Sequence, residues 1–114
     1  MDRAWITQLR KGLTELSVLA ALQQGEAYGY DLLQRLARTE PLATTPATLY
    51  PVLARLTDNG LISVREAPSP AGPPRRYYRL TDAGRKQLND MAIYWQDLTT
   101  AVDHLLHPAT GDAL

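Results

Sequence analysis

The sequence of 114 residues contains no cysteine, which excludes disulfides, thiolate nucleophiles and thiolate metal sites. No stretch approaches the ~18 consecutive apolar residues of a membrane-spanning helix. Asp2, Arg3 and the pair Arg10 and Lys11 interrupt the apolar run that a signal peptide would need. We therefore expect one domain in a reducing cytoplasm with no membrane partner, and the hydrophobic content of 45% is enough for its core.

The sequence also lacks the patterns of an enzyme or a metalloprotein. It has no phosphate-binding glycine loop and no nucleophile spaced from a general base as catalysis requires. His104 and His107 lie three residues apart with only Asp103 beside them, so complementing a helix dipole is a simpler role for them than binding a metal. We expect no catalytic residue, no cofactor and no metal.

The net charge is zero, which argues weakly against a nucleic-acid binder, but the charges are unevenly distributed. From Arg35 to Lys86 nine basic residues face four acidic ones, an excess of five. After Lys86 there are four aspartates and no lysine or arginine. This distribution favours one surface for an anion and another for a different partner, with ordinary surface charge as the alternative.

Apolar residues that recur every three or four positions predict helices over residues 4–23 and 28–38, with Gly25 ending the first. A third helix begins near Pro46 and stops at Gly60. Either Thr45 caps it with Pro46 in first position, or Thr48 caps a later start with Pro51 in the first turn. Both alternatives leave an irregular first turn with free N–H donors, which suits an anion.

The period then changes to two, which predicts a hairpin. Residues 61–66 and 75–80 read as strands, joined by the proline-rich loop 67–74. Tyr78 and Leu80 fall on one face of the second strand, and Arg75, Tyr77 and Arg79 fall on the other. A last helix, opened by Thr81 and Asp82, runs to about residue 106.

The order of elements predicts a mainly α fold with a two-stranded β wing, which is the winged helix-turn-helix plan. Residues 1–82 form the DNA-binding domain, whose first helix also contributes to a dimer. Residues 83–107 form a long C-terminal dimerisation helix, and residues 108–114 are a frayed tail. In this plan the third helix enters the major groove of DNA, and the wing runs along the backbone beside it.

Three segments resemble the PadR-type transcriptional regulators: GEAYGYDLLQRL (residues 25–36), ATLYPVLARLTDNGLI (47–62) and RRYYRLTDAG (75–84). Their order and spacing are similar across about 60 residues of this chain. The resemblance implies a dimeric, usually repressing, DNA-binding protein of the smaller subfamily with a single short C-terminal helix. The proline-rich wing tip departs from the pattern, since many relatives carry more charge there.

Seven residues are candidates for DNA contact. Hydroxyls and helix N–H groups bind phosphates and base edges, and arginines bind phosphates. The resemblance implies that the tyrosine of the third helix faces DNA, with core packing as the alternative. The alternative for the threonines is helix capping. For Arg75 and Arg76 it is a solvated charge that discourages pairing at the edge of the sheet, and for Arg55 it is an ion pair with Asp58. The candidates are Thr44, Thr45, Thr48, Tyr50, Arg55, Arg75 and Arg76.

The last helix carries a heptad stripe that needs a second chain, because a domain this small covers only its beginning. The stripe consists of Leu88, Met91, Trp95, Leu98, Val102 and Leu105. We expect a homodimer, and its two-fold symmetry predicts a palindromic operator with half-sites about 10 base pairs, or a multiple of a turn, apart. The alternative is a helix that folds back on its own domain.

Trp95 in this stripe is either a large interface residue or part of a ligand site. In drug-responsive members of the family, a tryptophan at the matching position stacks on planar aromatic compounds. Trp5, Tyr94 and Asp97 would line such a pocket, and the acid would favour cationic ligands. The sequence and the resemblance thus indicate a homodimeric repressor of promoter DNA, with release by a small aromatic effector if Trp95 belongs to a ligand site. The rival is a winged-helix protein-interaction module that never touches DNA.

Overall fold

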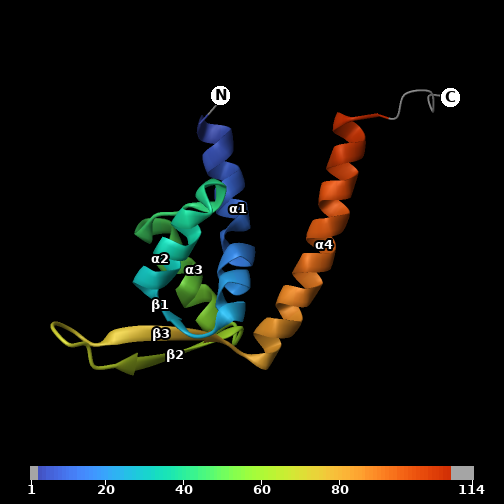
Figure 1. Cartoon of the computed structure of the whole chain (residues 1–114). Coiled ribbons are helices and arrows are strands. Elements are labelled where there is room, and N and C mark those ends of the chain that lie inside the picture. The colour runs from blue at the N-terminus through green and yellow to red at the C-terminus, as the bar shows by residue number, and fades with distance from the viewer. Residues whose placement is uncertain (1–2, 109–114) are drawn as a thin grey trace.

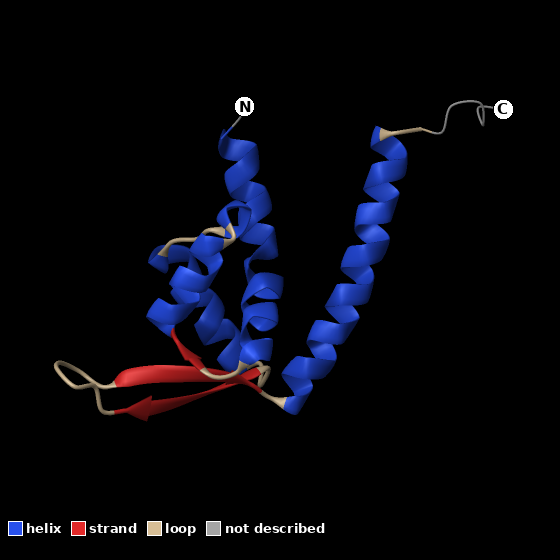
Figure 2. Ribbon diagram, in the orientation of Figure 1, coloured by secondary structure: helices blue, strands red, loops and turns tan. Residues whose placement is uncertain are grey.

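A computed structural model describes residues 3–108 as four α-helices, two short 3-10 helices and three strands (Figures 1 and 2). Helices α1, α2 and α3 pack together, and the sheet lies at one end beneath them. In chain order the elements are α1 (Arg3–Ala21), η1 (Leu22–Gln24), β1 (Ala27–Tyr28), α2 (Gly29–Arg38), η2 (Glu40–Leu42), α3 (Pro46–Asp58), β2 (Ile62–Ala67), β3 (Arg75–Leu80) and α4 (Asp82–Leu106).

The predicted winged-helix plan is confirmed, with one addition. The sheet has three antiparallel strands in the order β1-β3-β2, whereas the sequence predicted a two-stranded wing. The extra strand, β1, pairs Ala27 with Tyr78 and Tyr28 with Tyr77. Two residues are too few to show the alternating pattern by which a strand is recognised, so the sequence could not reveal it.

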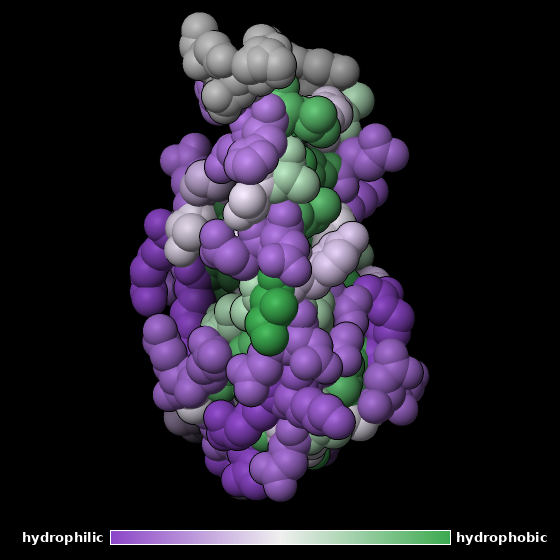
Figure 3. Space-filling view, turned by 90° about the vertical axis from the view of Figure 1, so that its right-hand side faces the viewer, coloured by the Kyte–Doolittle hydropathy of each residue, from purple (hydrophilic) through white to green (hydrophobic). Residues whose placement is uncertain are grey.

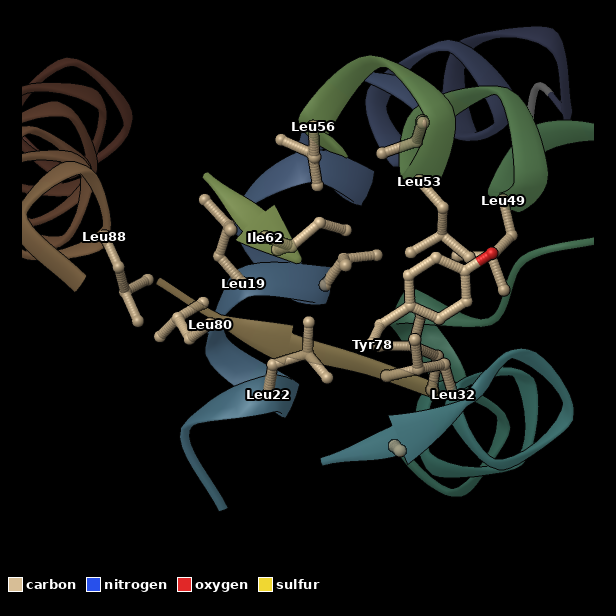
Figure 4. Close-up of a cluster of buried hydrophobic side chains, with 14 residues drawn as sticks. Leu19, Leu22, Leu32, Leu49, Leu53, Leu56, Ile62, Tyr78, Leu80 and Leu88 are labelled. Atoms are coloured by element: carbon tan, nitrogen blue, oxygen red, sulfur yellow. The ribbon is translucent and has the colours of Figure 1, made fainter. Parts of the chain in front are cut away.

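The core lies between the helices and one face of the sheet (Figure 4). Tyr78 and Leu80 of β3 point into it and are each 6% exposed, as the alternation predicted. Leu49 and Leu53 of α3 lie above Tyr78 in this view, and Leu19 and Leu22 lie toward Leu80. Burying each leucine side chain contributes about 1.5–3 kcal/mol, so this cluster holds α3 on the sheet.

The start of α3 follows the first of the two predicted alternatives. Thr45 is the N-cap, and its Oγ1 accepts a hydrogen bond of 3.3 Å from the backbone N–H of Thr48. Pro46 occupies the first turn, and the helix continues through Pro51. Because proline has no N–H, Pro51 cannot donate to the carbonyl of Ala47, and the first turn stays irregular.

A short joint connects the end of α3 to α4. The Thr81 hydroxyl donates to the Gly60 carbonyl at 2.7 Å and accepts from the Gly84 N–H at 3.0 Å. Gly60 has a φ of 74°, a conformation that favours glycine, and it turns the chain into β2. The backbone of α4 approaches the carbonyl of Leu61 so closely that only glycine fits at position 84.

From this joint α4 projects away from the sheet and rises alongside α1 (Figure 1). The radius of gyration is 17.2 Å, whereas a compact domain of this length would have about 13 Å. The projecting half of α4 accounts for the difference. Of the predicted tail, residues 109–114 lie outside the described part of the chain. Within residues 3–108 no helix is long and apolar enough to cross a membrane.

Candidate nucleic-acid interface

Three threonines gather at the first turn of α3. Thr45 is exposed, while Thr44 and Thr48 are half-buried. They line a small hollow of about 140 Å³, whose opposite wall comes from α1 and includes Arg10 and Lys11. These two basic residues were not among the predicted candidates, because they lie more than thirty positions before α3 in the chain. The hydroxyls and the two cations together suit a phosphate.

Tyr50 is both packed and exposed. Its ring rests on the backbone of Gly29, where an added Cβ would lie 2.8 Å from both Cε1 and Oη of the tyrosine. The residue nevertheless remains 44% exposed. The hydroxyl end of the side chain is therefore packed against Gly29, while the residue as a whole stays partly open to solvent. Contact with DNA stays a prediction for this residue.

Arg55 has a different partner from the one that the sequence suggested. Its Nη2 donates to Oε2 of Glu15 on α1 at 3.4 Å, rather than pairing with Asp58 on its own helix. The side chain is 55% exposed, and an exposed pair of this length contributes little to stability. Arg55 thus remains available to a phosphate, and its role in DNA binding stays a prediction.

Arg75 and Arg76, which the sequence grouped together, lie on opposite faces of β3. Arg76 shares the face of the buried Tyr78 and Leu80, beyond the edge of the core. Its side chain is 65% exposed, and its Nε lies 3.6 Å from Oε2 of Glu66. Arg75 shares the outer face, where its guanidinium lies 4.6 Å from the centre of the Tyr28 ring. Of these two arginines, Arg76 is therefore the one on the helix side of the wing.

The outer face of the sheet carries a continuous set of polar and aromatic contacts. Arg65 of β2 forms two hydrogen bonds to Glu26, from Nε at 2.7 Å and from Nη2 at 2.6 Å. The hydrogen bond from Arg65 lowers the pKa of Glu26 below its ordinary value, with burial opposing the shift. The Arg65 guanidinium lies 4.8 Å from the Tyr77 ring, and Tyr77 contacts Tyr28 with ring centres 5.6 Å apart.

The heptad stripe of α4 changes from buried to exposed along the helix. Leu88 is 4% exposed and belongs to the core of its own chain, and Met91 packs against that core. Figure 3 faces the side of α4 that is turned away from α1 and shows separate green apolar side chains among purple polar ones. The exposed fractions beyond Met91 are 38% for Trp95, 42% for Leu98, 45% for Val102 and 82% for Leu105.

Two of the four residues predicted for a ligand site meet in one cleft. Tyr94 and Trp95 line a mainly apolar space of about 370 Å³ between α1 and α4, together with Leu13 and Leu16. Trp5 and Asp97 do not line this cleft. The acid at its wall is Asp90, which was not predicted although Asp90 and Tyr94 are four residues apart and therefore share a helix face.

The residues described, 3–108, include no group of three or more histidine or carboxylate side chains that would hold a metal ion. His104 lies in the last turn of α4, and His107 follows as the C-cap. The hydroxyls and cations at the start of α3 and the exposed arginine of the wing are groups to which a ligand of negative charge could bind.

Comparison with known proteins gives consistent matches. Residues 18–90 match the family described as the transcriptional regulator PadR-like family. The negative transcriptional regulator PadR of Bacillus subtilis (strain 168) is 30% identical over 88 residues, which cover 75% of this chain and 48% of that protein. The chain therefore spans about half the length of this relative.

Two solved structures are similar to this one. A PadR family transcriptional regulator from Eggerthella lenta superposes with a TM-score of 0.84 at 33% identity, covering 94% of this chain and 93% of the other. The structure of Bacillus subtilis PadR in complex with operator DNA superposes with a TM-score of 0.65 at 30% identity, covering 69% and 46%. The similarity extends over nearly the whole of the first and over less than half of the second.

Proposed function

Since the chain belongs to the PadR-like family of transcriptional regulators, we propose that it binds double-stranded promoter DNA in the cytoplasm as a homodimeric repressor. The single observation that carries this proposal is that exposed hydrogen-bonding and basic side chains occur on the two elements of the winged-helix fold that meet DNA, the third helix and the wing. The first turn of α3 presents threonine hydroxyls and an exposed tyrosine, and the wing presents Arg76. A similar protein from Bacillus subtilis has been solved with operator DNA.

The DNA-binding surface that we propose consists of the start of α3 and the helix side of the wing. Thr44, Thr45 and Thr48 contact phosphates or base edges through their hydroxyls, and Tyr50 contacts the DNA through its exposed edge. Arg76 holds a phosphate beside them. Arg55, whose pair with Glu15 is long and exposed, adds a further contact from the second half of α3.

The homodimer in this proposal is supported by the exposed half of the stripe on α4. Trp95, Leu98, Val102 and Leu105 are large apolar residues that the chain leaves open. A helix with such a face is stable in water when it packs against another helix. With Leu88 already in the core of its own chain, the interface would begin at Met91 and extend to the end of α4. Two-fold symmetry then requires a palindromic site.

The effector in this proposal is a small aromatic compound bound beside Trp95. The apolar cleft between α1 and α4 supports it, because two aromatic residues and one carboxylate, Asp90, line its wall. Plain packing of Trp95 in the dimer is the alternative. Quenching of tryptophan fluorescence by aromatic dyes distinguishes the two, and a Trp95→Leu variant that retains the quenching would show that Trp5 reports it.

Fluorescence anisotropy with a labelled duplex from the region upstream of the gene, and with a random duplex, tests DNA binding. Removing one phosphate contact makes the negative slope of log K against log salt shallower by about 0.9, and hence by about 1.8 in a dimer. We expect this change for Arg76→Ala. Lys86→Ala removes the same charge from the second turn of α4, a helix that begins at the end of the sheet opposite the wing loop (Figure 1), and should leave the slope unchanged.

The rival function is a winged-helix module that binds proteins and not DNA. If neither the upstream duplex nor a pool of random duplexes binds at low salt, that rival becomes the better account. Size-exclusion mass separately distinguishes a dimer from a monomer. If the protein binds DNA as a monomer, the proposed regulator function stands, but a palindromic site is no longer expected.

A further inference from the structure

Five residues on the outer face of the sheet contact one another, and we call this cluster the wing clasp. They are Glu26, Tyr28, Arg65, Arg75 and Tyr77. The ion pair between Glu26 and Arg65 spans the central strand β3. The guanidinium of Arg65 lies over the Tyr77 ring, and that of Arg75 lies over the Tyr28 ring. The clasp thus includes residues of all three strands and the one residue immediately before the first.

We propose that the wing clasp positions the wing for DNA binding without itself touching DNA, so that Glu26, Arg65 and Arg75 are positioning residues. The inference rests on the proposed DNA binding and assigns different tasks to the two arginines that begin β3, next to the wing loop. Arg76 contacts the phosphate, and Arg75 fixes the strand from which Arg76 extends.

The geometry of the wing shows why a clasp is needed. The hairpin β2–β3 extends well beyond the helices (Figure 1), and β1 pairs with it through only two residue pairs. Arg76 sits near the far end of β3, where a small change in the angle of the hairpin moves it a long way. The bond between Glu26 and Arg65 joins the segment before β1 to β2, and so it ties the two edges of the sheet together.

The contact of Arg75 with Tyr28 separates it from the phosphate site. A guanidinium over a tyrosine ring within about 6 Å gains a cation–π attraction, and this one lies at 4.6 Å. Alternation along β3 directs Arg75 away from the face that carries Arg76. Reaching a phosphate on the helix side would require Arg75 to leave the ring and pass around the strand.

The clasp also reaches α3 through the start of α2. Tyr28 is the N-cap of α2, and the next residue, Gly29, supports the ring of Tyr50. A shift of Tyr28 therefore displaces the surface on which the proposed DNA-facing tyrosine rests. The clasp in this way sets the wing and the start of the recognition helix relative to each other.

Reversing one charge of the clasp provides a sharp test. Glu26→Lys makes the protein more positive near the wing, so electrostatic attraction alone would strengthen DNA binding. The proposal expects the opposite: weaker binding to the upstream duplex at every salt concentration. The double variant Glu26→Lys/Arg65→Glu restores a pair of opposite charges and the original net charge, and it should recover most of the affinity.

A double-mutant cycle then identifies the mechanism. In the wild-type background, the loss of affinity caused by Arg76→Ala should be about 3.5-fold larger at 50 mM salt than at 200 mM salt for each phosphate contact removed. In the Glu26→Lys background Arg76→Ala should have little further effect at either concentration, because the wing no longer places Arg76. Additive effects of the two substitutions would overturn the proposal, as would Glu26→Lys binding as tightly as wild type.

Circular dichroism and the melting temperature establish that each variant is folded. Should Glu26→Lys fail to fold, Glu26→Gln replaces it, since it keeps the shape of the side chain and removes only its charge. The proposal is supported if Glu26→Gln binds DNA more weakly than wild type and if Arg76→Ala then causes little further loss of affinity. It is overturned if Glu26→Gln binds as tightly as wild type. Failure of the wild-type protein to bind any duplex is a separate result, which removes the proposed function itself.

Discussion

Replacing Gly84 by alanine tests the joint between the winged-helix part of the chain and α4. Gly84 lies in the first turn of α4, directly against the chain that leaves α3. An added Cβ would overlap the carbonyl oxygen of Leu61 and lie 3.0 Å from its carbonyl carbon. These are backbone atoms, so no side-chain rotation removes the overlap, and α4 must move away from the strand.

Two opposing terms set the expected size of the effect. Overpacking a site that cannot adapt costs up to about 3 kcal/mol. Alanine is favoured over glycine within a helix by roughly 1 kcal/mol, which offsets part of that cost. The net loss of about 2 kcal/mol corresponds to a fall in melting temperature of about 8 °C for a domain of this size.

The matched control is Gly12→Ala in the middle of α1, the same change at another helical glycine. Nothing lies within 4 Å of a Cβ built there, so only the higher helix propensity of alanine applies. The melting temperature should therefore rise by a few degrees. Both variants are compared with wild type by thermal unfolding at one protein concentration, since a dimer melts in a concentration-dependent way. A Gly84→Ala protein as stable as wild type would refute the close approach of α4 to Leu61.

Three further predictions concern the core, the cap of α3 and the clasp. Leu53→Ala, at a residue 1% exposed, should lower the free energy of unfolding by about 3 kcal/mol in urea titrations, and a decrease far smaller than this would contradict its burial. Thr45→Ala should cost about 1 kcal/mol by removing the acceptor for the Thr48 N–H, whereas Thr45→Ser should cost little. Because Arg65 lowers the pKa of Glu26 below 4.5, the stability that this carboxylate contributes is present above pH 4.5 and disappears as pH falls through the lowered value. The difference in melting temperature between wild type and Glu26→Gln should therefore shrink from pH 7 to pH 3, and a constant difference would contradict the ion pair.

Local patterns along the chain were sufficient to predict most of the fold. The positions of α2, α3 and α4, the strands of the hairpin and the faces of β3 follow from apolar spacing, glycine stops and threonine caps. The two-residue strand β1 was not predicted because its backbone pairing with β3 is a tertiary contact. The first helix was predicted to run to residue 23, but it ends at Ala21 and tightens into the 3-10 turn η1 before Gly25, whose φ is 125°.

The candidate site was less predictable, because it depends on which residues distant in sequence meet. Nothing in the sequence around Arg55 indicates that Glu15, forty positions earlier, is its partner. The same holds for Arg10 and Lys11, which reach the start of α3 only when α1 packs beside it. Trp5 was predicted to line a ligand pocket with Trp95, and within one chain the two do not share a cleft.

The neighbouring arginines of the wing show how secondary structure converts adjacency in sequence into separation in space. In a helix, two consecutive arginines would diverge by about 100° and still share one side of the molecule. In a strand they point to opposite faces, so Arg75 meets the ring of Tyr28 while Arg76 faces the side of α3. The carboxylate that ties the sheet together, Glu26, lies fifty positions before Arg76 in the chain. The affinity that Arg76 contributes should consequently depend on Glu26, a dependence that no pattern within the wing itself contains.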